Sequence, residues 1–140
     1  MQKNDTHIAV IQSRMGSSRL PGKSMASVSG KPLLWHIIKR LKKSAYLNKI
    51  IIATSTLKEN DILEKLSKNE RVEIIRGDEN NVFSRFEEAF SIYNPNTMTR
   101  ICGDCPLVDS SFIDRSIETI FKQNVDYLQY DSKRVIHQGT

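Results

Sequence analysis

Short apolar runs recur along the chain, and polar residues bound each of them. The runs cover residues 8–11, 49–53, 72–75, 98–101 and 125–128. Runs of this length are typical of strands that are buried on both faces, as in a parallel sheet. The pattern therefore predicts five strands.

Apolar residues recur with helical spacing between these runs. The four faces are Leu33, Leu34, Ile37, Ile38 and Leu41; Ile62, Leu63 and Leu66; Val82, Phe83, Phe86, Ala89 and Phe90; and Ile113, Ile117, Ile120 and Phe121. Pro32 lies near the first position of the first helix, where its missing N–H costs nothing, and Asp109 is placed to cap the fourth. We expect Trp35 and the three phenylalanines of the third helix to belong to the core.

Alternating strands and helices of this length indicate βαβ units, so we predict an α/β domain with a Rossmann-like, doubly wound, mostly parallel sheet. The domain should occupy residues 1–140. The fifth predicted strand would leave a sheet edge uncovered, which natural domains usually avoid. We therefore expect the chain to be the N-terminal part of a longer domain, truncated at its C-terminus.

The composition is that of an ordinary folded protein, with 39% hydrophobic residues, 26% charged residues and a net charge of +5. The longest aliphatic runs fall far short of the roughly 20 residues that span a bilayer. The polar start, residues 1–6, does not fit a signal peptide. Two cysteines are too few for a disulfide framework. These features predict a cytoplasmic protein without a membrane partner.

The connection after the first strand, residues 12–23, concentrates positive charge among glycines and serines. Arg14, Arg19 and Lys23 lie within ten residues of one another. Exposed N–H groups and three cations suit a triphosphate, and ligands of open α/β sheets bind after the carboxyl ends of strands. No aromatic residues alternate with the cations, so we expect an anion site and no nucleic-acid partner. A plain polar surface loop remains the alternative.

Two common phosphate motifs do not match this connection. A P-loop needs four residues between its first glycine and Gly-Lys-Ser/Thr, whereas five separate Gly16 from Gly22. Pro21 also favours an extended Leu20, so the loop should run on before a helix begins. The dinucleotide fingerprint Gly-x-Gly-x-x-Gly is absent.

Two longer motifs resemble one family. They are QSRMGSSRLPGK at residues 12–23, followed by GKPL at 30–33, and RICGDCPLVD at 100–109. This order resembles the cytidylyltransferases of the spore coat polysaccharide biosynthesis protein F type. These are relatives of the synthetases that make CMP-activated 3-deoxy-manno-octulosonate and sialic acids. The resemblance runs from about Ile8 to the end of the chain.

The resemblance implies CTP and a sugar or sugar acid as substrates, Mg²⁺ as cofactor, and a homodimer for the full-length family protein. Arg14, Lys23 and Asp104 would be catalytic, Asp104 would bind the metal, and Arg19 would face the acceptor's carboxylate or phosphate. The implied nucleotide-binding residues are Gln12, Arg14, Gly16, Ser17, Lys23 and Cys102.

The position of Asp104 supports its assignment independently of the resemblance. It follows the fourth strand by three residues, so it lies at the carboxyl edge of the sheet. If that strand neighbours the first strand, the carboxylate faces the basic loop across the crevice. Mg²⁺ needs only one or two carboxylates beside substrate phosphates. The alternative is that Asp104 is a turn residue after Gly103.

The sequence departs from the family pattern at several positions. Cys102 stands where the sugar-acid synthetases carry a glutamine and nearer relatives often a threonine, which leaves the preference for CTP open. Ser13 and Ser18 replace the usual alanine and threonine. The family's second metal-binding acid follows a glycine that corresponds to Gly139, and the sequence ends one residue later. We therefore expect half of the metal site to be missing, with the segment for sugar binding and dimerisation.

Cys102 and Cys105 form a Cys-x-x-Cys motif, but neither redox chemistry nor metal binding by two thiols is favoured. A thioredoxin-like pair follows an early strand, whereas this pair follows the fourth. Asp104 between the two cysteines should raise their pKa values rather than lower them.

The sequence thus predicts transfer of CMP from CTP to a sugar or sugar acid, with release of pyrophosphate, in making a surface polysaccharide. Two alternatives stay open. One is a domain that binds nucleotide without catalysis. The other, less favoured, is a P-loop-like kinase or NTPase.

Overall fold

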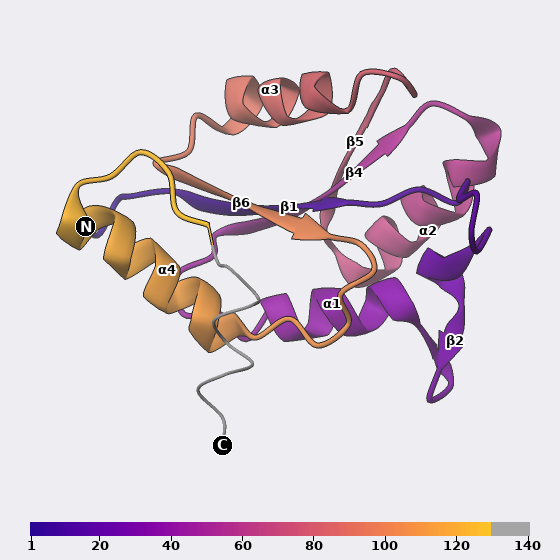
Figure 1. The fold of residues 1–140 in the computed structure, drawn as a ribbon, viewed down its shortest axis with the longest axis horizontal. Coiled ribbons are helices and arrows are strands. Elements are labelled where there is room, and N and C mark those ends of the chain that lie inside the picture. The colour runs from indigo at the N-terminus through magenta and orange to yellow at the C-terminus, as the bar shows by residue number, and fades with distance from the viewer. Residues whose placement is uncertain (130–140) are drawn as a thin grey trace.

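The computed structural model describes residues 1–129 and contains a four-stranded parallel sheet (Figure 1). Its strands are β1 (His7–Gln12), β4 (Lys49–Ser55), β5 (Glu73–Gly77) and β6 (Thr97–Cys102). Their order is β5-β4-β1-β6, so the chain first builds outward on one side of β1 and then returns to the other side. The predicted Rossmann-like, doubly wound fold is confirmed, and its topological switch point lies between β1 and β6.

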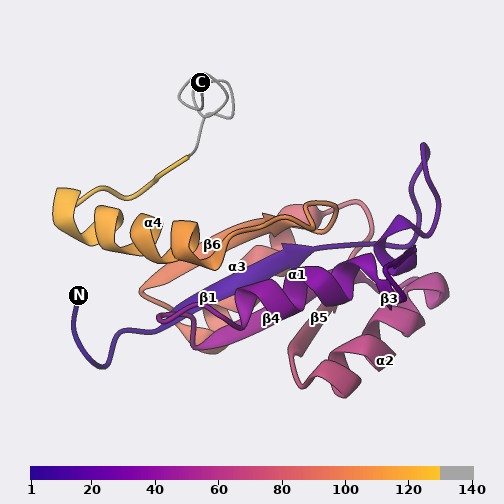
Figure 2. The ribbon, with the colours of Figure 1, turned by 90° about the horizontal axis from the view of Figure 1, so that it is seen from below.

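Helices cover both faces of this sheet (Figures 1 and 2). The helices α1 (Leu33–Leu41), α2 (Asp61–Glu70) and α4 (Ser110–Gln123) lie on one face, and α3 (Val82–Tyr93) lies on the other. Successive residues of β1 serve the two layers alternately: Ala9 packs toward α1, and Val10 packs toward α3. This double coverage explains why the run at residues 8–11 is apolar throughout.

Capping side chains fix the starts of two helices. Asp109 accepts a hydrogen bond from the backbone N–H of Ser111, which confirms it as the N-cap of α4. Asn81 accepts from Ser84 N in the same way at α3. Helix α1 begins directly after Pro32, whose fixed φ suits the entry to a helix. None of the helices within residues 1–129 is long and apolar enough to cross a bilayer.

The predicted fifth strand is wrong. Residues 125–128 follow α4 without strand pairing, and Asn124 ends that helix in the left-handed conformation, with φ 50°. The side chain of Tyr127 is 74% exposed. A short, mixed run becomes a strand only where a partner strand pairs with it, and within residues 1–129 the outer edge of β6 pairs with none.

Helix α3 also differs from expectation. Phe86 and Ala89 are buried against the sheet, whereas Phe83 and Phe90 are 69% and 50% exposed. Residues seven apart share one side of a helix, and in α3 that side faces away from the sheet.

Trp35 of α1, also expected in the core, is only partly buried and packs beside the ammonium groups of two lysines, Lys31 and Lys39.

A small hairpin lies between β1 and α1, and the hydrophobic pattern did not indicate it. Its strands are β2 (Ser27–Val28) and β3 (Lys31–Pro32), and a short 3₁₀ helix, η1 (Lys23–Met25), precedes them. Ser29 and Gly30 form its turn with φ values of 49° and 79°. Two positive φ angles are typical of the tight turns that join twisted strands.

Candidate active site

A cavity of about 470 Å³ opens at the carboxyl edge of the sheet, at the switch point between β1 and β6. The loop after β1, the segment after β5 and the segment after β6 line it. Its charged lining residues are Arg14, Arg19, Lys23, Arg85 and Arg100, with Glu79 and Asp104. The cations exceed the carboxylates by three, so the cavity favours an anion.

Backbone hydrogen bonds close the basic loop on itself. The N–H of Gly22 donates to the carbonyl oxygen of Met15 at 2.7 Å. Gly22 has a φ of 74°, which glycine adopts without a steric penalty. Below the loop, the buried hydroxyl of Ser13 donates to that of Ser24 at 2.7 Å. These contacts hold the two ends of the loop together, and the cations Arg14 and Lys23 lie at those ends.

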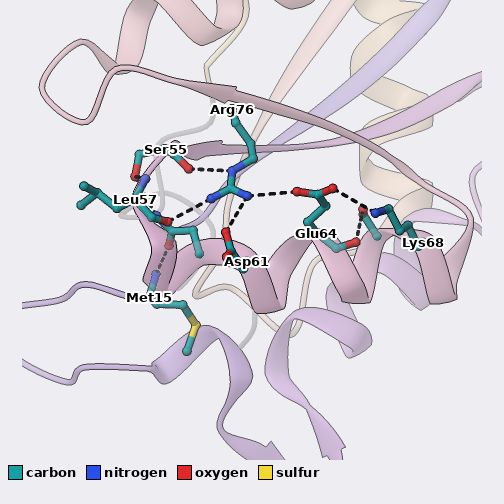
Figure 3. A network of polar contacts seen from close by, with 9 residues as sticks. Met15, Ser55, Leu57, Asp61, Glu64, Lys68 and Arg76 are labelled. Carbon is teal, nitrogen blue, oxygen red and sulfur yellow. Dashed lines mark hydrogen bonds and ion pairs between the residues drawn. The ribbon is translucent and has the colours of Figure 1, made fainter.

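Asn60 joins this loop to the neighbouring strand. It is fully buried, its Oδ1 accepts from the backbone N–H of Met15 at 2.8 Å, and its Nδ2 donates to the hydroxyl of Ser55 at 2.7 Å. Beside it, Arg76 donates to the carbonyl oxygens of Ser55 and Leu57 at 3.1 and 2.9 Å (Figure 3). The position of the basic loop therefore depends on the ends of β4 and β5.

Arg76 is itself held by acidic side chains of α2 (Figure 3). Its Nη1 lies 2.8 Å from a carboxylate oxygen of Asp61 and 3.0 Å from one of Glu64. Hydrogen bonds from Lys68 and Arg76 lower the pKa of Glu64, and hydrogen bonding to Asp61 raises the pKa of Arg76. Both groups thus stay charged at neutral pH, so the network persists there.

Asp104 faces the basic loop, as the sequence predicted for a strand beside β1. Its Oδ2 lies 2.9 Å from the Nζ of Lys23, and this hydrogen bond lowers the pKa of Asp104. Both side chains are partly exposed, so the pair itself adds little stability, on the order of 0–1 kcal/mol. A phosphate can therefore replace Asp104 as the partner of Lys23 at low cost, and a metal cation can replace Lys23 as the partner of Asp104.

Gly103 brings Asp104 to this position. Its N–H donates to the carbonyl oxygen of Gln12 at 2.9 Å, which ties the end of β6 to the end of β1. A Cβ atom on Gly103 would lie 2.6 Å from that same backbone oxygen. Such a distance is closer than van der Waals contact permits, so this approach requires glycine.

Arg14 is paired across the cavity with an acid that the sequence did not single out. Its Nη1 lies 3.0 Å from Oε1 of Glu79, in the segment after β5. A hydrogen bond from Ser55 lowers the pKa of Glu79, and Arg14 lowers it further, against the opposing effect of burial. Glu79 is therefore a carboxylate at neutral pH that holds Arg14 in the cavity.

Two further arginines line the cavity that were not predicted as site residues from the sequence. Arg100 donates to Oε1 of Gln12 at 3.0 Å, and Arg85 is buried with its Nη2 donating to the carbonyl oxygen of Asp78 at 2.8 Å. The sequence did contain a sign that Arg85 is buried, because it stands three residues after Val82 on the sheet-facing side of α3. A cation in such a position is rare unless a polar cavity lies nearby.

The other predicted site residues also border the cavity. Gln12, Gly16, Ser17 and Cys102 line it, and Arg19 lies at its exposed rim. The structure thus brings together every residue that the sequence singled out for nucleotide, metal and acceptor.

The Cys-x-x-Cys pair follows β6 directly, and both thiols are free and exposed. Partial burial raises the pKa of Cys105, and the neighbouring Cys102 and Asp104 raise it further. A redox-active pair needs a lowered thiol pKa. The raised pKa of Cys105 agrees with the expectation that this pair does not carry thioredoxin-like chemistry.

The basic loop does not have the path of a P-loop. In a P-loop the glycine-rich segment leads directly into a helix. Here η1 and the hairpin of β2 and β3 come first, and α1 does not begin until Leu33. The P-loop-like alternative is therefore not supported.

A doubly wound sheet with a cationic loop and a facing carboxylate at its switch point defines a nucleotidyltransferase-like domain. The sequence profile of the family described as Cytidylyltransferase matches residues 8–139. The chain therefore belongs to the cytidylyltransferase family, a family of transferase enzymes.

Similar proteins support the same family. The chain is 36% identical over 122 residues to the spore coat polysaccharide biosynthesis protein SpsF of Bacillus subtilis, across 84% of this chain and 51% of that protein. It is 37% identical over 106 residues to a 3-deoxy-manno-octulosonate cytidylyltransferase of Bartonella tribocorum, across 72% of this chain and 42% of that protein.

Among solved structures, a cytidylyltransferase from Leptospira borgpetersenii superposes with a TM-score of 0.80 at 31% identity. The match covers 85% of this chain and 50% of that one. The chain thus spans about half the length of the curated relatives it matches.

Proposed function

We propose that this domain binds CTP and supports transfer of CMP to a sugar or sugar acid, with release of pyrophosphate. The observation that carries the proposal is the approach of Lys23 and Asp104 across the switch-point cavity, 2.9 Å apart. A cation for phosphate and a carboxylate for a metal ion are the two groups that this chemistry requires. Membership of the cytidylyltransferase family supports it.

The residues of the cavity are suited to Mg²⁺ and provide one protein ligand for it, Asp104. Asp104 offers an exposed carboxylate at the cavity, and Mg²⁺ commonly takes one or two carboxylates together with substrate phosphates. A bound Mg²⁺ would supply charge neutralisation at the α- and β-phosphates. Lys23, released from Asp104, and Arg14, released from Glu79, would bind the phosphate oxygens and hold the α-phosphorus in line with the acceptor.

We assign the other predicted site residues to the phosphates, the nucleoside and the acceptor. Gly16 and Ser17 would offer backbone N–H groups to the phosphates, and Gln12 and Cys102 would lie along the nucleoside. Arg19, at the exposed rim, would meet the carboxylate or phosphate of the acceptor. The names of the relatives, which include a spore coat polysaccharide protein and a 3-deoxy-manno-octulosonate enzyme, support a role in making a surface polysaccharide.

The proposal extends to the setting of the reaction. Residues 1–140 form the N-terminal part of a longer nucleotidyltransferase domain, which acts in the cytoplasm, and the full-length family protein forms a homodimer. The composition and the share of the relatives that the chain covers support this part of the proposal.

Charge removal in the basic loop tests the nucleotide site. Lys23→Ala and Arg14→Ala should each weaken CTP binding about 10- to 100-fold, because a charge-assisted contact contributes roughly 1.5–3 kcal/mol. Calorimetric titration with CTP and Mg²⁺ measures the effect. Lys43→Ala, at an exposed position after α1, serves as the control and should bind like the wild type. Unchanged affinity in both loop variants would remove the basic loop from the site.

A nucleotide-binding domain without catalysis is the second candidate. The chain spans about half the length of the curated relatives it matches, which favours this candidate for this polypeptide. Both candidates bind CTP, so pyrophosphate release by a chain extended with the C-terminal half of a relative separates them: a non-catalytic domain would still release none.

A further inference from the structure

The turn after β6 gathers three metal-binding side chains, of which Cys102 and Asp104 also line the proposed nucleotide site and Cys105 does not. One ligand atom each from Cys102, Asp104 and Cys105 lie within 4.8 Å of one another. The N–H of Cys105 donates to the carbonyl oxygen of Cys102 at 3.3 Å, which closes the turn. Its Sγ lies 3.8 Å from Oδ1 of Asp104. All three side chains are exposed, so a cation can reach them from solvent.

The chemistry of these three donors does not suit Mg²⁺ alone. Mg²⁺ takes oxygen ligands in octahedral geometry, whereas thiolates select soft or borderline cations such as Zn²⁺. Two cysteines separated by two residues are a recurrent Zn²⁺ pair, and three protein ligands with an open fourth position are typical of an accessible zinc site. The turn therefore offers a donor set for a thiophilic cation.

We propose that Cys102, Asp104 and Cys105 form a binding site for a thiophilic divalent cation such as Zn²⁺. On binding, the two thiols release their protons to solvent, and a water molecule or phosphate oxygen fills the fourth position. Two thiolates and one carboxylate around a divalent cation leave a net charge of −1. Lys23, whose Nζ lies 2.9 Å from Asp104, complements that charge.

Asp104 is shared between this site and the proposed Mg²⁺ site, so occupancy by the thiophilic cation excludes the Mg²⁺ role of Asp104. This step rests on the proposed function, whereas cation binding itself does not. The site thus makes nucleotide binding sensitive to Zn²⁺. Cys105 is outside the cavity lining, so it confers this sensitivity without being a predicted nucleotide contact itself.

Titration of the chemically reduced 140-residue chain with Zn²⁺ and with Cd²⁺ tests the site. Because the chain has only two cysteines, a thiolate-to-cadmium charge-transfer band in the ultraviolet reports this pair directly. We expect one ion per chain. Cys102→Ser, Cys105→Ser and Asp104→Asn should each weaken Zn²⁺ binding by at least about tenfold, since even outer partners of metal ligands are worth about 10- to 100-fold. His36→Gln, which removes another zinc-binding type of side chain elsewhere on the chain, is the control.

Three results would overturn the site: no charge-transfer band, one ion per two chains, or unchanged Zn²⁺ affinity in the double variant that combines Cys102→Ser with Cys105→Ser. Circular dichroism confirms that the variants are folded, as expected for exposed positions. These titrations contain no nucleotide, so their outcome is independent of whether the chain binds CTP.

A second titration tests the antagonism. Added Zn²⁺ should weaken binding of CTP with Mg²⁺ at least about tenfold in the wild type and leave it unchanged in Cys105→Ser, by the same ligand argument. Equal inhibition of both proteins would mean that Zn²⁺ acts on the nucleotide itself, which contradicts a shared Asp104. If neither protein binds CTP while Zn²⁺ binding persists, the proposed function fails and the cation site stands.

Discussion

A buried histidine joins β1 to β6 at the end of the sheet opposite the cavity. His7 is 3% exposed, and its Nδ1 lies 2.8 Å from the hydroxyl of Thr97. Its ring also packs edge-on against Phe121. Burial lowers the pKa of His7 below its ordinary value of 6.5, so the fold holds the neutral imidazole.

This burial predicts a loss of stability in acid. Below pH 6.5 the unfolded chain binds a proton at His7 that the folded chain does not, so the free energy of unfolding should fall until the pH passes the lowered pKa of the folded state. Urea denaturation at a series of pH values between 7.5 and 5 measures this slope. His7→Gln should flatten it, and an unchanged slope would show that other groups cause the acid sensitivity.

At the residue scale, sequence identified both partners of one ion pair of the cavity and only one partner of the other. Lys23 and Asp104 could both be found, because each lies in a dense motif directly after a strand. Glu79 could not, because the segment that carries it has ordinary surface composition, and only the fold places it opposite Arg14 at 3.0 Å. Charges that act through tertiary contacts leave little local pattern.

At the scale of elements, the ends of β1 and β6 depend on one glycine. Gly103→Ala would place a methyl group 2.6 Å from the carbonyl oxygen of Gln12 and 2.9 Å from Cβ of Ser13. Because backbone cannot yield as a flexible side chain can, we expect a loss of about 1–3 kcal/mol in the free energy of unfolding, as for other overpacked sites. The displaced turn should also weaken CTP binding.

Chemical denaturation and CTP calorimetry of this variant measure the two effects. Gly30→Asn is the matched control, because nothing lies within 4 Å of a Cβ there and asparagine tolerates the positive φ of a tight turn. Wild-type stability and affinity for Gly103→Ala would mean that the turn adjusts freely and does not fix Asp104.

The sequence predicted best those elements that are buried on both of their faces. The core of β1 is fully buried on both faces, so its composition alone identified it. The run at residues 125–128 looked similar but contains Asp126 and has no partner strand within residues 1–129. The hairpin of β2 and β3 was missed because strands of two residues are too short to show a period.

For the whole molecule, the topology explains why Lys23 and Asp104, 81 residues apart in the sequence, form one site. The chain crosses from β5 over the sheet through α3 to β6, which pairs with β1 along its full length. The carboxyl ends of these strands bring the loop at Arg14 to Lys23 and the turn at Asp104 to the same edge. Everything proposed to hold the triphosphate therefore lies within residues 1–129.

We propose that transfer to the acceptor needs groups beyond this half. The family resemblance places a second metal-binding acid just after the glycine that corresponds to Gly139, outside the described residues. The curated relatives are about twice as long as the matched part of this chain. One carboxylate can bind a magnesium–triphosphate complex, but two hold the ion for in-line attack.

The 140-residue chain should therefore bind CTP with Mg²⁺ and release pyrophosphate only near the background rate, whatever sugar acid is offered. A misplacement of about 1 Å can cost on the order of a hundredfold in rate, and a single protein ligand leaves the ion mobile. Release should become measurable in a chimera that adds the C-terminal half of the Bacillus subtilis relative, and Asp104→Asn should abolish it there. Robust release from the 140-residue chain, lost in Asp104→Asn, would show that one carboxylate suffices, whereas release that survives Asp104→Asn would remove Asp104 from the metal site altogether.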